Sequence, residues 1–509
     1  MTTNVGRTAM SIRNASATFF NRGLTLILNF IGRTVFLQCL SAEYLGLSGL
    51  FGNIFSVISL CELGFGAAIT QSLYKPMAKG DEYEVCRIMN YFNKVYSIVA
   101  FVTAVSGIAV MPFLDNLVGH GEIPNLKIVY LLFLFHSVVS YLFAPKRTLI
   151  VCDQRLYVVT LLRTLFSVII LAFQIAVLKS TKDYCLYIAV RIFFLAVEGF
   201  ITEVYAQKKY SFLDRKLYVA KEYKNKIHQK VKALILHKFG AIMNNSTDSI
   251  LISYFLGLEC MGMYSNYALI ITSVGTLIDI VMSSVSASVG NLGATSNKKN
   301  SEKVMRELYF LNFWLLTCCT AVLMCTANSL IRLWLGEDML FGTGFLVVVV
   351  SCFYFSCVRD PVQIFLQAYG IFEPTRFMNP IRAFVNITVS CLLIKKYGII
   401  GVFSGTLIST ITVPLWYEVK MLYKYGFGIS PKEFVKEMSG FMACTYICSG
   451  LAFFATHSFS CTLLGMVMSV LVSLCIVNAI IFVVYRKSGY FGAATKLIRR
   501  ISAAFSDNK

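Results

Sequence analysis

Apolar runs of about 20 residues recur along the whole chain, and each is long enough to cross the ~30 Å hydrocarbon core of a bilayer. Of the 509 residues, 57% are apolar and only 14% are charged, against roughly a quarter in an ordinary soluble domain. No polar linkers separate the runs. The pattern predicts an all-α polytopic membrane protein with fourteen spans, near 17–39, 44–68, 95–115, 127–144, 157–178, 184–205, 233–256, 264–287, 308–331, 343–367, 377–395, 399–419, 437–457 and 462–485.

The basic residues predict the orientation of these spans. With both termini placed in the cytoplasm, 33 of the 46 Lys and Arg fall in inner segments, 6 in outer loops and 7 within spans. Cytoplasmic loops carry such an excess of Lys and Arg in membrane proteins, so this distribution predicts the orientation. It also accounts for the formal net charge of +20, which therefore gives no reason to expect a nucleic-acid partner. The most basic inner segment, 206–232, is typical of a cytoplasmic connector lying near anionic membrane lipids.

Two stretches of the sequence resemble each other at an offset of 216 residues. Glu43-Tyr44-Leu45-Gly46-Leu47 corresponds to Glu259-Cys260-Met261-Gly262-Met263, and the same offset pairs Arg22 with Lys238 and Asn29 with Asn245. We therefore predict two pseudo-symmetric lobes of six spans, residues 1–232 and 233–430, with a terminal span pair and basic tail at 431–509. Because six is an even number, both lobes would have the same topology, as in transporters built from parallel repeats.

Seven basic residues lie within the predicted spans, where a charge costs at least ~2.5–3.5 kcal/mol unless it faces the bundle interior or water. In the first span Arg22, Asn29 and Arg33 share one helical stripe. An anion moving along the membrane normal could follow such a stripe, although pairing with acids is the alternative. The candidate contacts for an anionic group are Arg22, Asn29, Arg33, Arg163, Arg191, Lys238, Asn245, Arg359 and Arg382.

Acidic residues within the spans are candidates for coupling transport to an ion, or for serving as structural counter-ions. They are Asp248, Glu62, Glu198 and Asp360. Asp360 belongs to an Arg-Asp-Pro sequence, and the proline at 361 predicts a local kink or break in that span. No set of ligands identifies the ion, so H⁺ and Na⁺ both remain open.

Motifs for nucleotide hydrolysis, zinc proteolysis and nucleotide-sugar transfer are absent from the sequence. It has no GxxxxGK[ST] and no HExxH, and no Asp-x-Asp pair. The 16 cysteines form no CxxC pair and lie mostly in apolar runs, so we expect reduced thiols and neither a metal site nor a cofactor. The outer loops are too short for an external catalytic domain. These features favour a secondary transporter over an enzyme.

Several short motifs resemble one family. They are Tyr44-Leu45-Gly46-Leu47-Ser48-Gly49-Leu50-Phe51, Glu62-Leu63-Gly64-Phe65-Gly66, Ser72-Leu73-Tyr74-Lys75-Pro76, His237-Lys238-Phe239-Gly240 and Asn245-Ser246-Thr247-Asp248. With these motifs the whole chain resembles the Wzx-type polysaccharide flippases of the multidrug/oligosaccharidyl-lipid/polysaccharide exporter superfamily.

The resemblance implies a function. Such a protein would move an undecaprenyl-pyrophosphate-linked oligosaccharide from the inner to the outer leaflet of a bacterial plasma membrane by alternating access, for capsule, O-antigen or exopolysaccharide synthesis. A polymerase and chain-length machinery would then be its partners, with H⁺ or Na⁺ coupling expected for the superfamily. Two alternatives remain open at this point: a cation-coupled multidrug exporter of the same superfamily, and a membrane-embedded glycan transferase or polymerase.

Overall fold

The structure is a computed structural model that describes residues 4–62, 65–118, 123–215, 217, 221–295, 298–459 and 461–492. Within these residues every regular element is a helix, which confirms the all-α prediction. The described residues of the fourteen predicted spans lie almost entirely in helices. In the described part of the chain, ten helices are long and apolar enough to cross a membrane. The chain is therefore a multi-pass membrane protein.

The chain forms two compact units, residues 1–262 and 263–509. This division lies inside one long helix, whereas the sequence repeat places the lobe boundary at 232; the predicted lobes 1–232, 233–430 and 431–509 therefore stay a prediction. The first unit contains α1 (Asn4–Cys39), α2 (Ala42–Ile58), α3 (Phe65–Lys79), α4 (Glu82–Val110), α5 (Leu114–Val118), α6 (Leu126–Cys152), α7 (Leu156–Thr181), α8 (Tyr184–Lys209) and the first part of α9 (Lys221–Thr295).

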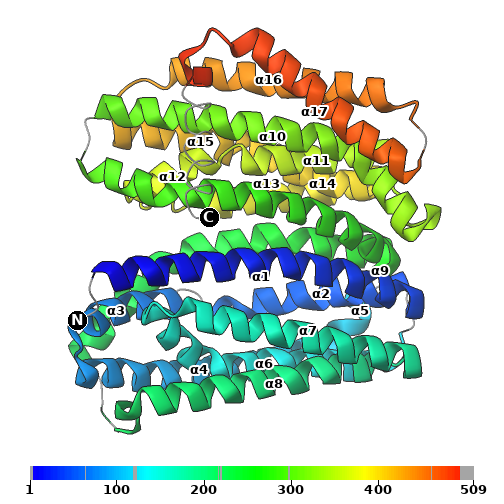
Figure 1. Ribbon diagram of the computed structural model, residues 1–509. Coiled ribbons are helices and arrows are strands. Elements are labelled where there is room, and N and C mark those ends of the chain that lie inside the picture. The colour runs from blue at the N-terminus through cyan, green and yellow to red at the C-terminus, as the bar shows by residue number, and fades with distance from the viewer. Residues whose placement is uncertain are drawn as a thin grey trace. The chain divides into compact units, whose positions relative to one another are not determined.

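The helices of the first unit pack as an antiparallel bundle (Figure 1). α1 packs against α7, α7 and α6 pack against α8, and α4 packs against α6. Asn14 fixes the register of the first pair, because its side chain bonds both the carbonyl oxygen of Gln154 and the backbone N–H of Tyr157, each at 2.8 Å. Further along the same face, the amide of Asn21 donates to the Thr164 hydroxyl. These polar contacts fix the axial position of α1 on α7, which apolar packing alone would specify less well.

Two apolar clusters stabilise this bundle. One joins α2, α6 and α8 around Phe51 and Tyr130, which are fully buried and whose rings lie edge to face at 5.2 Å. The other joins α3, α4 and α6 around Phe92 and Leu149, which are also fully buried. Edge-to-face aromatic pairs add to the stabilisation from burial alone.

Helix α2 crosses α9 at a pair of glycines. A β-carbon at Gly46 would overlap the carbonyl oxygen of Leu258, and one at Gly262 would overlap that of Ala42. In the sequence repeat, with its offset of 216 residues, position 42 corresponds to 258 and position 46 to 262. The contact of Gly46 with Leu258 is therefore equivalent to the contact of Gly262 with Ala42. The crossing is locally two-fold symmetric, as expected for repeats related by an axis along the membrane normal.

Two helices are interrupted where the sequence carries helix-breaking residues. In α9, Gly257 has φ 88° and ψ 170°, a conformation open to glycine alone, and it separates the predicted spans 233–256 and 264–287. The span at 343–367 ends as α11 (Thr343–Cys357) and resumes as α12 (Asp360–Ala368). Pro361 lies in the first turn of α12, where its missing N–H costs nothing, so the predicted break is confirmed.

The second unit also contains α10 (Lys298–Leu335), α13 (Met378–Tyr397), α14 (Ile399–Thr412), α15 (Pro414–Met421), α16 (Lys432–Thr456) and α17 (Leu463–Tyr485). α10 packs against α11, α16 and α17, and α13 pairs with α14. The rings of Phe313 on α10 and Phe441 on α16 stack at 4.6 Å. Tyr485 packs edge to face on Phe313 at 5.7 Å, so the terminal pair α16–α17 shares an aromatic core with α10.

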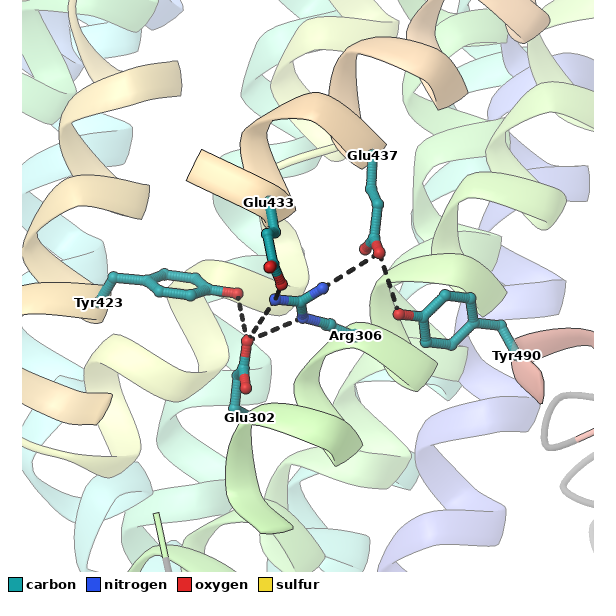
Figure 2. Close-up of polar contacts among 6 residues, drawn as sticks. All are labelled: Glu302, Arg306, Tyr423, Glu433, Glu437 and Tyr490. Carbon is teal, nitrogen blue, oxygen red and sulfur yellow. Dashed lines mark hydrogen bonds and ion pairs between the residues drawn. The ribbon is translucent and has the colours of Figure 1, made fainter. Parts of the chain in front are cut away.

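A cluster around Arg306 ties α16 to the start of α10 (Figure 2). The Arg306 guanidinium lies 2.6 Å from Glu302, 3.7 Å from Glu433 and 3.1 Å from Glu437. Two tyrosine hydroxyls complete the cluster at 3.2 Å: Tyr423 donates to Glu302, and Tyr490 donates to Glu437. One cation therefore holds three carboxylates that come from two helices.

Candidate functional site

The polar residues of α1 lie on one side of a continuous helix. At about 100° per residue, Arg22, Asn29 and Arg33 fall within a sector roughly 40° wide, next to the direction in which Asn14 and Asn21 face α7. The exposed apolar residues Phe20, Ile27 and Ile31 lie on the opposite side. Arg22 and Arg33 are half-buried, and Asn29 is exposed. The stripe predicted from spacing is therefore present and lies beside α7.

Two further arginines extend this polar surface. Arg163 lies on α7 and is the residue before Thr164, whose hydroxyl accepts a hydrogen bond from the Asn21 amide. Arg191 lies on α8, one turn after Tyr187. Both arginines are exposed side chains. The Tyr187 ring packs edge to face on Phe36 of α1 at 5.4 Å. Arg33 lies one turn before Phe36 and Arg191 one turn after Tyr187, so the two arginines lie at one level of the bundle.

These contacts order the arginines along the bundle. Arg22 and Arg163 lie at the level of the Asn21–Thr164 contact, and Arg33 and Arg191 lie about 16 Å further along, the rise of the eleven residues from Arg22 to Arg33. Among the described residues, no carboxylate lies within ion-pair distance of Arg22, Arg163 or Arg191. We call these four arginines the arginine column. It can hold an anionic group at two levels of one unit.

The neighbouring basic residues of α6 are, by contrast, paired with acids of α8. Arg147 lies 3.2 Å from Glu198, and Lys146 lies 3.5 Å from Glu203. Glu198 is only 4% exposed, so the pair with Arg147 supplies the counter-charge that a buried carboxylate requires. Glu198, a candidate for ion coupling, thus has a basic partner in the structure.

Arg359 forms the most buried ion pair of the second unit. Its Nε and Nη2 atoms donate to the two carboxylate oxygens of Glu418 at 2.9 and 2.7 Å, and Gln363 donates to the same carboxylate at 3.1 Å. Arg359 and Glu418 are 5% and 2% exposed. A bidentate pair of this kind orients both side chains rigidly, and Arg359, a candidate anion contact, therefore has a carboxylate partner.

Three further candidates are Arg382, Asp360 and Asp248. Arg382 on α13 donates to the Thr410 hydroxyl of α14 at 2.9 Å. Asp360 adjoins Arg359 and is the first residue of α12. Asp248 is buried, 8% exposed, within α9. Close to it, Ser249 accepts from the Asn53 amide at 3.0 Å, which links α9 to α2.

Glu62 and the repeat-related residues complete the list of candidates. Glu62 lies at the end of the short helix 59–62 and accepts a hydrogen bond from the Tyr96 hydroxyl. The side chains of Lys238 and Asn245 lie outside the described residues, so their predicted roles stay predictions.

Sequence reasoning missed Arg147, Tyr187 and Glu418. Arg147 lies just beyond the predicted inner end of the span 127–144. Glu418 lies next to the last residue of the predicted span 399–419, at the membrane edge, and was therefore not identified as a candidate. Their partners are distant in sequence: Glu418 is 59 residues from Arg359. No spacing rule within one helix connects such residues. Tyr187 lies four residues before Arg191, a helical spacing that places the two side chains on one face.

No protein-family model and no curated protein matches the sequence. Several solved structures are similar in fold, including the three that follow. The lipid II flippase MurJ, in an inward closed conformation, has a TM-score of 0.66 and 15% identity over 93% of this chain and 99% of MurJ. An inward-facing multidrug resistance MATE family transporter of the MOP superfamily has a TM-score of 0.57 and 14% identity over 78% of this chain and 94% of the transporter. The Vibrio cholerae MATE transporter VcmN has a TM-score of 0.56 and 14% identity, over 83% and 99%.

The fold is therefore like that of MurJ and of these MATE transporters. The described helices follow that fold over nearly the whole length of MurJ. At these identities the likeness establishes the fold and leaves the substrate to be argued from the residues.

Proposed function

We propose that this protein is a flippase that moves an undecaprenyl-pyrophosphate-linked oligosaccharide from the inner to the outer leaflet of a bacterial plasma membrane. The observation that carries the proposal is the arginine column. Arg22, Arg163 and Arg191 have no carboxylate partner among the described residues. Arg163 and Arg191 lie on helices that are long and apolar enough to span a membrane, and Arg22 lies on α1, which the sequence predicts to be a span. Guanidinium groups bind phosphate oxygens in a bidentate manner, so a pyrophosphate would supply the anion that such residues require.

The two levels of the column suit a path along the membrane normal. Arg22 and Arg163 would meet the pyrophosphate near the inner side, and Arg33 and Arg191 would receive it about 16 Å further along. Tyr187, next to the second level, could bond sugar hydroxyls. The polymerase and chain-length machinery would then use the flipped repeat unit.

The drug-exporter alternative fits the column less well. A site for cationic drugs requires acidic or apolar walls, whereas the column is cationic and its neighbouring acids are paired with other bases. Coupling to H⁺ or Na⁺ belongs to the proposal, with Asp248, Glu62, Glu198 and Asp360 as candidates. In the structure Glu198 lies beside Arg147 and Glu62 accepts a hydrogen bond from Tyr96.

The test is the fate of lipid-linked intermediates in cells. Deletion of the gene is expected to leave complete repeat units on the inner leaflet. Arg22→Ala and Arg191→Ala should do the same, whereas Arg22→Lys and Arg191→Lys should keep partial transport. Arg376→Ala serves as the matched control, because Arg376 is exposed and lies outside the column. Unchanged intermediates combined with altered drug tolerance would favour the exporter instead.

A further inference from the structure

The first unit contains a cavity of 310 Å³ between α4, α6 and α8. Its volume falls at the lower end of the range found for small-molecule sites. The lining residues that matter here are Asn93, Ser97, Leu142, Phe143, Lys146 and Glu203. None of them belongs to the arginine column, so the cavity is a second place where this unit could hold a ligand.

The cavity lies at the depth of lipid headgroups. Asn93 and Ser97 flank the predicted start of the span at 95–115, Lys146 follows the predicted end of 127–144, and Glu203 precedes the end of 184–205. All three helix ends belong to the side that carries the excess of Lys and Arg, which is the cytoplasmic side by the positive-inside rule. A ligand here would thus come from the inner leaflet.

The wall of the cavity carries one charge of each sign. The Lys146 ammonium lies 3.5 Å from the Glu203 carboxylate, and the two side chains are 12% and 26% exposed. This distance is longer than a well-formed charge-assisted hydrogen bond, and an ammonium has three donors, so each group can take a further partner. Gln207 donates to Glu203 at 3.2 Å, which fixes the position of the carboxylate.

The remaining walls suit the upper part of an acyl chain and a glycerol ester. Leu142 is 53% exposed beside the cavity, and Phe143 supplies a second apolar surface. Asn93 and Ser97 supply polar side chains to the same cavity, and such groups can donate hydrogen bonds to ester oxygens. Apolar and polar surfaces therefore meet at one point, as they do in a phospholipid.

We propose that this cavity binds the phosphoethanolamine headgroup of an inner-leaflet phospholipid, with Lys146 on the phosphate and Glu203 on the ammonium. An acidic headgroup such as phosphatidylglycerol would leave Glu203 facing an anion. The quaternary ammonium of phosphatidylcholine has no N–H to donate to the carboxylate. The cavity should therefore select phosphatidylethanolamine over both.

Native mass spectrometry of the purified full-length chain tests the proposal. The chain is released from mixed micelles that contain equal amounts of the three lipids with identical acyl chains. Phosphatidylethanolamine adducts are expected to exceed the other two by about tenfold, the ratio that one charge-assisted contact supports. Lys146→Glu and Glu203→Lys should each abolish this preference, and the combined swap should restore it in part.

Two variants separate the cavity from general effects. Lys94→Glu changes an exposed charge at the same depth outside the cavity and should keep the preference. Ser97→Trp fills the cavity without altering its charges and should abolish the preference, so the test remains decisive if a charge variant fails to fold.

Equal retention of the three lipids by the unmodified chain would overturn the proposal, as would an equal loss in the Lys94 variant. Soluble glycerophosphoethanolamine is the last arm of the experiment. Binding of this compound as strong as that of the lipid would overturn the assignment to a membrane lipid, because the proposal requires the acyl chain to contact Leu142 and Phe143.

Discussion

At the level of single residues, this protein places charges on its membrane-spanning helices in two ways. Arg359 and Glu418 satisfy each other with two hydrogen bonds, and Arg147 and Glu198 form a second pair between helices. Arg163 and Arg191 lie on the same kind of helix and Arg22 lies on α1, all three without a carboxylate partner among the described residues. The first group stabilises the fold, and the second is the group that we propose to bind an anion.

Substitutions at Arg359 and Glu418 should reveal this difference. Arg359→Met or Glu418→Met alone leaves a buried charge without compensation and is expected to lower the free energy of unfolding by about 3–5 kcal/mol. The double variant removes both charges and should lose far less. Unfolding of the three variants in detergent measures the coupling. Losses that simply add in the double variant would contradict the pairing.

Sequence spacing identified the stripe on α1 because all its members lie on one helix. It could not separate Arg359 from the arginine column, since the partner of Arg359 comes from a different helix and is selected by packing. Counting charges likewise locates the ionisable residues within the spans, but it does not predict which of them form ion pairs with one another.

At the level of elements, glycine and proline determine where helices break. The break predicted at Arg359-Asp360-Pro361 is present between α11 and α12, because proline favours a helix start. Gly257 was expected only as part of a short loop between two spans. The structure instead keeps α9 running on both sides of it, with this one residue in a non-helical conformation.

Gly257→Ala should therefore destabilise the protein. An alanine at φ 88° and ψ 170° is strained by about 1–3 kcal/mol. The matched control is Gly23→Ala on α1, where a β-carbon meets no atom within 4 Å and a helical alanine gains about 0.5–1 kcal/mol. Thermal unfolding should move in opposite directions for the two variants; a parallel shift would rule out the strain.

The attachment of α16 to α10 depends on Arg306. Arg306→Met leaves Glu302, Glu433 and Glu437 without their shared cation, so α16 is expected to exchange its amide hydrogens faster near its first turns. Hydrogen exchange followed by mass spectrometry measures this directly. Arg376→Met is the control: its pair with Glu373 is 3.9 Å long and exposed, and such pairs contribute about 0–1 kcal/mol. Equal exchange in both variants would remove the role given to Arg306.

At the scale of the whole molecule, the helical topology agrees with what the apolar runs predict, because a bilayer permits few ways to satisfy the backbone. The likeness in fold to MurJ over 93% of the chain extends this agreement. The number of spans was harder to predict, since α1 and α13 carry charges that lower their apolarity.

The orientation can be tested at this scale. With both termini in the cytoplasm, a single cysteine at Lys182, between α7 and α8, should react with a membrane-impermeant thiol reagent in intact cells. A cysteine at Arg215, after α8, should react only after the cells are opened. The chain used for labelling should first lose its exposed thiols, Cys461 and Cys475. Labelling of both sites, or of the second alone, in intact cells would reverse or reject the topology.

The crossing of α2 and α9 has a consequence for how the gene can change. At Gly46 and Gly262 even a methyl group would overlap a carbonyl oxygen of the facing backbone. Every single-base change of a glycine codon is either silent, a stop, or introduces a side chain: Ala, Ser, Cys, Val, Asp, Glu, Arg or Trp. No one-step replacement is therefore accommodated at either codon without a shift of the backbone. Because each overlap is with a backbone oxygen, replacing the side chain of Leu258 or Ala42 does not remove it. These two codons should drift only at their third base.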